Sequence, residues 1–177
     1  MRKVIAAINM TLDGYCDHTA IIPDEEIHQH YTELLSQGDI ILYGRITYQL
    51  MEFWQTILEN PSDEKSMNDF AEAIDKIQKI VFSRTLNNVE WESATIAKRD
   101  LKEEVSELRQ SSHSGSKDIF VGSRSLIIQL MKLNLIDEFQ LCVHPVIAGS
   151  GLPLFENMND RKKVYYFKKK EIPYFIA

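Results

Sequence analysis

The chain has no hydrophobic run long enough to cross a membrane, although 44% of its 177 residues are hydrophobic. A membrane-spanning helix needs about 20 consecutive apolar residues. The apolar segment 4–8 is interrupted by Asn9 and Asp13, and no small-residue cleavage site follows, so it indicates a buried strand and not a signal peptide. We therefore expect residues 1–177 to form a single globular domain with no membrane partner.

Positive charge and cysteine are also scarce. Twenty lysines and arginines stand against 26 aspartates and glutamates, giving a net charge of -6. Binding of nucleic acid without sequence preference needs clustered positive charge, so no nucleic-acid partner is expected. The two cysteines, Cys16 and Cys142, are far apart in sequence, which favours free thiols and a cytoplasmic location. No spacing of cysteine and histidine typical of zinc sites is present, so no metal is predicted.

The glycine-rich fingerprint of ordinary dinucleotide-binding domains, G-x-G-x-x-G, is absent as well. Instead, three short apolar runs each end in glycine or serine next to arginine. Ligands collect at the carboxyl ends of parallel strands, and helix N-termini and guanidinium groups bind anions. Each end alone also fits a turn with a solvated arginine, but together they predict a phosphate site, which is typical of a nucleotide or cofactor. The three ends are Gly44-Arg45 with Thr47, Ser83-Arg84, and Gly122-Ser123-Arg124.

Strand and helix patterns alternate along the chain and predict an α/β fold. Helices are expected after Asp24 and Asp100, which are good N-cap residues, and after Gly44, loop 56–66 and Ser123. The segment 111–116 reads as a loop, and 149–153 as a turn. Strands are expected at 4–8, 39–43, 80–83, 94–97, 119–121 and 139–143, with a closing pair at 164–167 and 174–176.

The chain resembles the dihydrofolate reductase superfamily, and more closely the reductase domain of bacterial riboflavin biosynthesis and its stand-alone relatives. The resemblance covers nearly the whole chain. It implies a mixed, mostly parallel central sheet of about eight strands flanked by helices. The segments that carry it are Ala6-Ala7, Thr11-Leu12-Asp13-Gly14-Tyr15, 44–48, 80–84, 120–126, 135–139 and 145–155.

The resemblance further implies an NADPH-dependent reductase of a small heteroaromatic substrate. That substrate would be pterin-like or pyrimidine-like, as for dihydrofolate reductase or 5-amino-6-(5-phosphoribosylamino)uracil reductase. By the same resemblance, the cofactor phosphates would be held at Gly44, Arg45 and Thr47. The choice of NADPH over NADH would rest on Ser83 and Arg84, the nicotinamide amide on the backbone around Ala6 and Ala7, and the pyrophosphate on Gly122, Ser123 and Arg124.

One position departs from the family pattern, because its pair of glycines is replaced by Gly122-Ser123. The second glycine allows close approach of the backbone to a ligand, whereas serine brings a side chain. Ser123 could cap the following helix and donate its hydroxyl to a phosphate, or it could mark a relative that binds the cofactor less tightly. The alternative function is therefore a non-catalytic nucleotide- or ligand-binding module that retains the fold.

Two acids are candidates for catalysis, Glu25 and Asp13. Folate enzymes engage the pterin with an acid on the first helix, and Glu25 is nearest in spacing, although the helix dipole also favours acids in a first turn. Asp13 equally fits a turn residue before Gly14. His144 is expected to be a packing or edge residue on a strand. The aromatic strands predicted at 164–167 and 174–176 suggest a homodimer, although they also fit an ordinary core.

Overall fold

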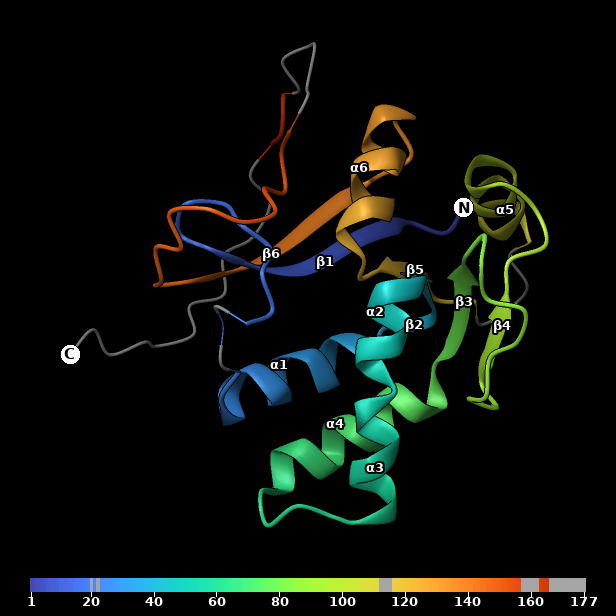
Figure 1. Cartoon of the computed structure of the whole chain (residues 1–177). Coiled ribbons are helices and arrows are strands. Elements are labelled where there is room, and N and C mark those ends of the chain that lie inside the picture. Colours follow the sequence, from blue (N-terminus) through green and yellow to red (C-terminus); the bar gives the residue numbers. More distant parts are fainter. Residues whose placement is uncertain (20, 22, 112–115, 157–162, 166–177) are drawn as a thin grey trace.

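The computed structural model describes residues 1–19, 21, 23–111, 116–156 and 163–165 (Figure 1). In this part of the chain six strands form one sheet in the order β4-β3-β2-β5-β1-β6, and every pair is parallel. This confirms the predicted α/β fold with a mostly parallel sheet, with six strands instead of about eight. The strands are β1 (Val4–Thr11), β2 (Gly38–Gly44), β3 (Gln78–Phe82), β4 (Ala94–Ile96), β5 (Asp118–Val121) and β6 (Glu138–His144).

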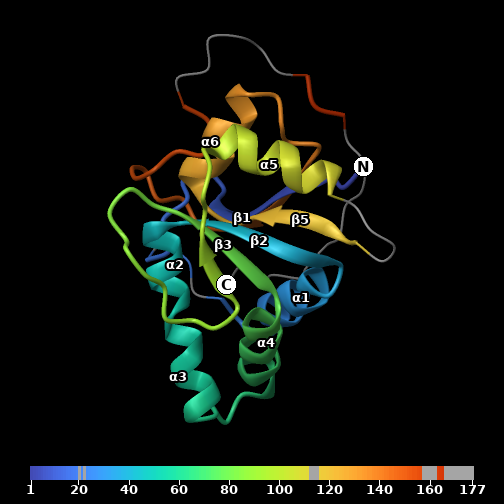
Figure 2. The ribbon, with the colours of Figure 1, turned by 90° about the vertical axis from the view of Figure 1, so that its right-hand side faces the viewer.

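Helices cover both faces of this sheet, with α1, α3 and α4 on one side and α5 and α6 on the other (Figure 2). Strands covered on both faces are expected to be apolar throughout, which explains the unbroken hydrophobic runs of β2 and β5. The helices are α1 (Glu25–Leu35), α2 (Arg45–Met51), α3 (Phe53–Glu59), α4 (Lys65–Lys76), α5 (Leu101–Gln110) and α6 (Arg124–Lys132).

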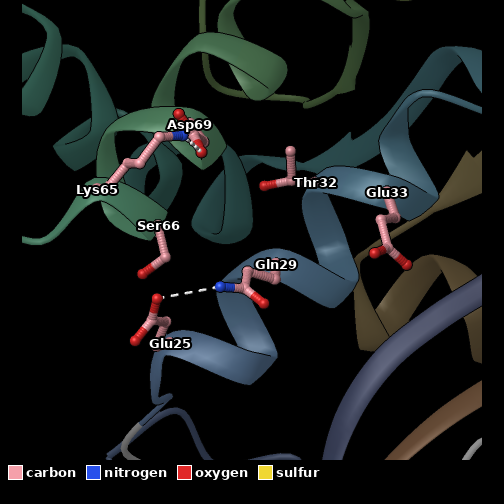
Figure 3. A pocket seen from close by; sticks show the side chains of 7 residues that line it. All are labelled: Glu25, Gln29, Thr32, Glu33, Lys65, Ser66 and Asp69. Carbon is pink, nitrogen blue, oxygen red and sulfur yellow. Dashed lines mark hydrogen bonds and ion pairs between the residues drawn. The ribbon is translucent and has the colours of Figure 1, made fainter.

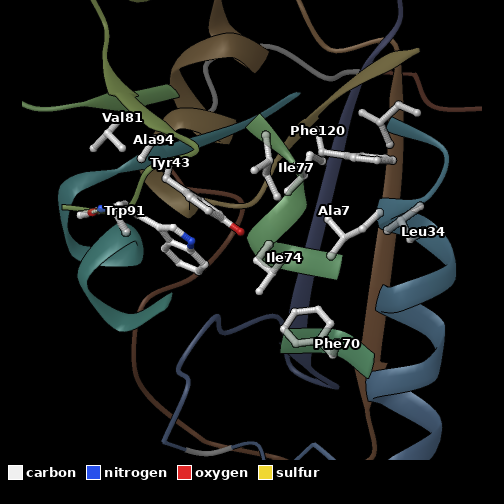
Figure 4. Close-up of a cluster of buried hydrophobic side chains, with 14 residues drawn as sticks. Ala7, Leu34, Tyr43, Phe70, Ile74, Ile77, Val81, Trp91, Ala94 and Phe120 are labelled. Carbon is white, nitrogen blue, oxygen red and sulfur yellow. Dashed lines mark hydrogen bonds between the residues drawn. The ribbon is translucent and has the colours of Figure 1, made fainter. Parts of the chain in front are cut away.

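Each face of the sheet has its own apolar core. On the α1 side, Tyr43 from β2 and Phe120 from β5 pack with Trp91 and Ile74 (Figure 4). On the other side, neighbouring positions of the same strands pack against α5 and α6, for example Leu42. This alternation follows from the two-residue period of a strand. It fixes which side of the sheet each polar residue of a strand will face.

The N-caps predicted at Asp24 and Asp100 are confirmed. Asp24 Oδ1 accepts from the backbone N–H of Ile27 at 3.0 Å, and Asp100 Oδ1 accepts from that of Glu103 at 2.9 Å. The helix predicted after Gly44 is instead two short helices, α2 and α3, which are separated at Glu52. Residues 163–165 are not in a strand, and the remainder of the predicted closing strands and most of loop 111–116 lie outside the described residues. No helix in the described residues is long and apolar enough to span a membrane.

A fully buried lysine anchors the beginning of β3. The Lys79 ammonium donates to the carbonyls of Asp75 and Ile77 and to Ser93 Oγ, and it lies 4.0 Å from the centre of the Trp91 ring. Burial lowers the pKa of Lys79 to about 8, an effect that the Asp75 carboxylate opposes. The charged amine is therefore tolerated because oxygen atoms and an aromatic face replace its water.

This arrangement predicts a pH-dependent stability. Between about pH 8 and pH 10.5 the unfolded chain binds a proton at Lys79 that the folded chain does not, so the contribution of Lys79 to the unfolding free energy rises with pH. We expect the unfolding free energy of the wild type, relative to Lys79→Met, to increase across this window in urea denaturation. Lys76→Met, which removes an exposed lysine of α4, is the matched control measured over the same pH window. A constant difference between wild type and Lys79→Met would contradict the prediction.

Candidate functional site

The connections of the sheet change faces at the carboxyl ends of β2 and β5, which is where an open α/β sheet is expected to leave a crevice. The chain leaves β2 into α2, whose Tyr48 packs in the core on the α1 side. It leaves the adjacent β5 into α6, whose Leu126 packs in the core on the opposite face. Neighbouring parallel strands whose connections depart on opposite faces leave a crevice between them, and this is where open α/β sheets bind ligands.

The three strand ends predicted as an anion site meet at this crevice. They belong to β3, β2 and β5, which are consecutive strands of the sheet. The N–H of Gly44 donates to Ser123 Oγ at 2.8 Å, which joins the ends of β2 and β5 directly. A Cβ placed on Gly44 would lie 3.4 Å from Ser125 Oγ and 3.7 Å from Ser123 Oγ. Glycine therefore leaves a small space that is bordered by two hydroxyls.

The two helices that begin at the crevice have no side-chain cap. Among the helices that next follow a strand, α1 and α5 are capped by aspartates, whereas α2 and α6 are not. Ser123 stands at the N-cap position of α6, but its hydroxyl accepts from Gly44 instead, so the prediction that Ser123 caps this helix is wrong. Backbone N–H groups that no cap satisfies suit an anion, as predicted.

The predicted arginines differ in their surroundings. Arg45 is exposed and donates to Gln49 Oε1 at 2.9 Å, one turn along α2. Arg84 is exposed at the end of β3 and forms no hydrogen bond or ion pair among the described residues. Arg124 is half-buried and donates to the Pro153 carbonyl at 2.7 Å and to Glu156 at 2.5 Å. Arg124 thus secures the loop around residue 153, and the structure leaves Arg45 and Arg84 as the guanidinium groups beside the crevice.

Serine, threonine and glycine positions near the crevice also have local roles. Ser83 Oγ accepts from the N–H groups of Thr85 and Leu86, so it closes a turn that presents Arg84. Thr47 is half-buried in the first turn of α2. A Cβ on Gly122 would lie 2.9 Å from the ring of Tyr43, so glycine is required there by packing.

The backbone of β1 borders the crevice at Ala7. The Lys3 carbonyl accepts from Ile119 of β5, so the alternation of a strand turns the backbone groups of Ala7 and Asn9 toward the same side. Within the described residues β5 pairs with β1 only as far as Ala6, and β1 continues beyond it (Figure 1). The Ala7 N–H therefore belongs to the last rung of the β1–β5 ladder, opposite Val121, and only the Ala7 carbonyl extends past the end of β5, whereas the backbone of Ala6 faces β6. Of the two predicted nicotinamide contacts, only Ala7 lies at the crevice.

Asp13 holds two loops together. Its carboxylate accepts from Thr11 Oγ1 at 2.6 Å and from the N–H groups of Ala148 and Gly149 at 3.1 and 2.8 Å. The Thr11 hydrogen bond, aided by those of Gly149 and Ala148, lowers the pKa of Asp13. Asp13 is therefore an ionised acceptor at neutral pH. This position favours a structural function over the predicted role as a proton donor.

Glu25 faces α4 and not the sheet. It lies about 200° around the helix from Ile27, which is buried. Its carboxylate accepts from Gln29 at 3.0 Å and lines a groove of about 250 Å³ between α1 and α4 (Figure 3). The structure does not bring Glu25 together with the strand ends. The other residues of this groove are Thr32, Glu33, Lys65, Ser66 and Asp69.

Sequence reasoning missed a polar cluster on the α1 side of β1. Asn9 Oδ1 lies 2.9 Å from Tyr31 Oη of α1 and 3.1 Å from His144 Nε2 at the end of β6. Burial lowers the pKa of His144, and the Asp24 carboxylate opposes this shift. The available signal was Asn9 itself, a polar residue on the strand face where Ile5 and Ala7 are buried in the core. Its partners could not be inferred without the β1–β6 pairing.

The sequence of this chain matches the model of the RibD C-terminal domain over residues 2–173. The chain belongs to the RibD C-terminal domain family. Its relatives include two proteins of Bacillus subtilis (strain 168), both described only as uncharacterised. YyaP is 33% identical over 168 residues, covering 90% of this chain and 84% of YyaP. YwjB is 27% identical over 169 residues, covering 92% of this chain and 88% of YwjB.

Solved structures show the same fold for this RibD C-terminal domain. A protein of Shewanella sp. PV-4, named for a proposed part in riboflavin biosynthesis, superposes with a TM-score of 0.59 at 20% identity. That match covers 91% of this chain and 86% of the other. The riboflavin biosynthesis reductase Rib7 of Saccharomyces cerevisiae gives a TM-score of 0.53 at 14% identity, covering 89% of this chain and 80% of Rib7. These findings confirm the predicted resemblance and give the RibD C-terminal domain a reductase-like fold.

Proposed function

We propose that this protein is an NADPH-dependent reductase of a small heteroaromatic compound, pterin-like or pyrimidine-like. The observation that carries the proposal is the crevice between β2 and β5. It combines two uncapped helix starts, the hydroxyls of Ser123 and Ser125, and the exposed guanidinium groups of Arg45 and Arg84. Groups of this kind suit the phosphates of a dinucleotide. Membership of the RibD C-terminal domain family supports the same reaction class.

Different groups along the crevice suit the successive parts of NADPH. The space at Gly44 and the adjoining hydroxyls suit the pyrophosphate, and Arg84 at the end of β3 suits the 2′-phosphate. The Ala7 carbonyl, which extends past the last rung of the β1–β5 ladder, suits the carboxamide of the nicotinamide as an acceptor. When bound, the cofactor supplies a hydride. The protein supplies orientation, because the donors follow directly on the ends of three neighbouring strands.

Selection of NADPH over NADH provides the first test. We expect NADPH to raise the melting temperature of the wild type more than NADH does. We expect Arg84→Ala to weaken NADPH binding by about tenfold to a hundredfold while leaving NADH unchanged, because a charge-assisted hydrogen bond contributes roughly 1.5–3 kcal/mol. Fluorescence titration gives the dissociation constants of NADPH and of NADH for the wild type and for Arg84→Ala.

The control for this test is Lys132→Ala, which removes an exposed positive charge at the other end of α6. It should bind both cofactors as the wild type does. A wild type that binds neither cofactor, or that binds NADPH no better than NADH, would refute the proposed cofactor. Equal losses of NADPH and NADH in Arg84→Ala would refute the assignment of Arg84.

A second candidate function is a ligand-binding module without turnover. It is favoured by the placement of the two predicted acids, because Asp13 is held by three hydrogen bonds and Glu25 faces α4. Incubation with NADPH and a panel of pterins, flavins and pyrimidines separates the two candidates. The reductase oxidises NADPH with at least one member of the panel, whereas the binding module binds ligand without consuming NADPH.

A further inference from the structure

The amide of Asn9 is held firmly from one side. Its Oδ1 accepts from the Tyr31 hydroxyl at 2.9 Å and lies 3.1 Å from His144 Nε2. An amide oxygen has two lone pairs, and both are used when His144 carries its proton on Nε2. Because Tyr31 comes from α1 and His144 from β6, the two contacts reach Asn9 from separate elements and fix the plane of its amide.

The other half of the same amide is available to a ligand. Asn9 is half-buried, and its Nδ2 forms no hydrogen bond among the described residues. Nδ2 is not among the buried unpartnered polar atoms of the described residues, so it is open to solvent and therefore to a ligand. Since the oxygen cannot turn away without losing Tyr31 and His144, Nδ2 remains directed away from them. An acceptor atom placed there would satisfy it.

Asn9 lies next to the place proposed for the nicotinamide. It follows Ala7 by two residues on β1, a separation of about 7 Å along a strand. Both residues turn their side chains toward α1 and their backbone groups toward the end of β5. A planar ring in contact with the Asn9 amide would therefore be within reach of a hydride donor bound at Ala7.

We infer that Asn9 orients the compound being reduced, with Nδ2 donating to a carbonyl oxygen on its ring. Tyr31 and His144 are positioning residues that act through Asn9. The inference rests on the proposed reductase function, because it assigns the substrate side of the same crevice. It also specifies the chemistry that is recognised. Among the described residues no aspartate or glutamate belongs to the buried polar set, and the recognising group proposed on this face of β1 is the Asn9 amide.

A matched pair of probes tests this donor. 5-Aminouracil carries carbonyl acceptors at two ring positions where 2,4,5-triaminopyrimidine carries amino donors. We expect the wild type to bind 5-aminouracil at least about tenfold more tightly, the value of one well-placed hydrogen bond. In Asn9→Asp the preference should reverse, because the outward atom becomes an acceptor while the inward oxygen still accepts from Tyr31 and His144. Titration calorimetry, with and without NADP⁺, measures both affinities.

Variants of the two supporting residues separate positioning from simple loss of structure. His144→Gln keeps a donor at the position of Nε2 and should keep the preference, whereas His144→Ala should lose most of it. Tyr31→Phe should reduce the preference several-fold without reversing it. A residue that served only packing would change the affinities of both probes by the same factor.

The outcomes distinguish this inference from the proposed function. An unchanged preference in Asn9→Asp, or a wild type that binds neither probe, overturns the inference even if NADPH binds normally. A wild type that shows the expected preference in the absence of cofactor but binds neither NADPH nor NADP⁺ overturns the reductase and leaves the role of Asn9 in place. Melting curves of each variant identify any that have failed to fold, and Tyr31→Phe, which removes one hydroxyl, then provides the decisive comparison.

Discussion

Gly44→Ala is expected to weaken NADPH binding by about tenfold to a hundredfold, roughly 1.4–2.8 kcal/mol, while the protein remains folded. The added Cβ would occupy the space bordered by Ser123 and Ser125, at contacts of 3.7 and 3.4 Å that are ordinary for a packed carbon. The backbone at Gly44 is extended, with φ of -80° and ψ of 162°, so alanine adopts it without strain. What is lost is the close approach of a phosphate to the backbone of the strand end.

The measurement is a fluorescence titration with NADPH, accompanied by a thermal melt of the free protein. Ser125→Ala is the matched control, because it removes one of the two hydroxyls but adds no atom to the space. It should weaken binding by less than Gly44→Ala does. If Gly44→Ala binds NADPH as the wild type does, the pyrophosphate does not lie at the end of β2, and the crevice is not the cofactor site.

The strand ends could be predicted from sequence because their signal is local. An apolar run followed by glycine or serine and arginine, as at Gly44-Arg45, indicates a buried strand, the end of that strand and a cation. All three features lie within a segment of about six residues. The parallel order of the sheet then places these ends together. The position of Glu25 was equally local, because the stripe of Ile27, Tyr31 and Leu34 already assigns Glu25 to the opposite face of the helix. Resemblance to folate enzymes outweighed that periodicity in the prediction.

The remaining features of the site depend on contacts between distant residues. Arg124 is held by Pro153 and Glu156, about 30 positions later, and nothing near Arg124 in sequence indicates this. Asn9 and His144 meet only because β6 pairs beside β1, 135 residues away in the chain. The separation of α2 from α3 at Glu52 involves no glycine or proline, so no helix-breaking residue in the sequence indicates it.

The glycine at the other end of β2 is required for a different reason. A Cβ on Gly38 would lie 2.3 and 2.6 Å from two ring atoms of Phe120 and 3.1 Å from the Asp118 carbonyl. Phe120 is 1% exposed and belongs to the core that also contains Leu34 and Leu35, so its ring has little room to move. Because the core is closely packed, a shift of the Phe120 ring would displace the side chains around it.

We therefore expect Gly38→Ala to lower the unfolding free energy by about 3 kcal/mol, a value at the upper end for overpacking of a core. For a chain of this size the melting temperature should fall by about 6–12 °C. Phe120→Leu removes part of the ring that the new methyl group meets, so the double variant should be less destabilised than the sum of the two single variants. Strict additivity would show that the overlap with Phe120 is not the cause. Gly44→Ala serves as the matched control on the same strand, because it adds the same methyl group without an overlap and should melt close to the wild type.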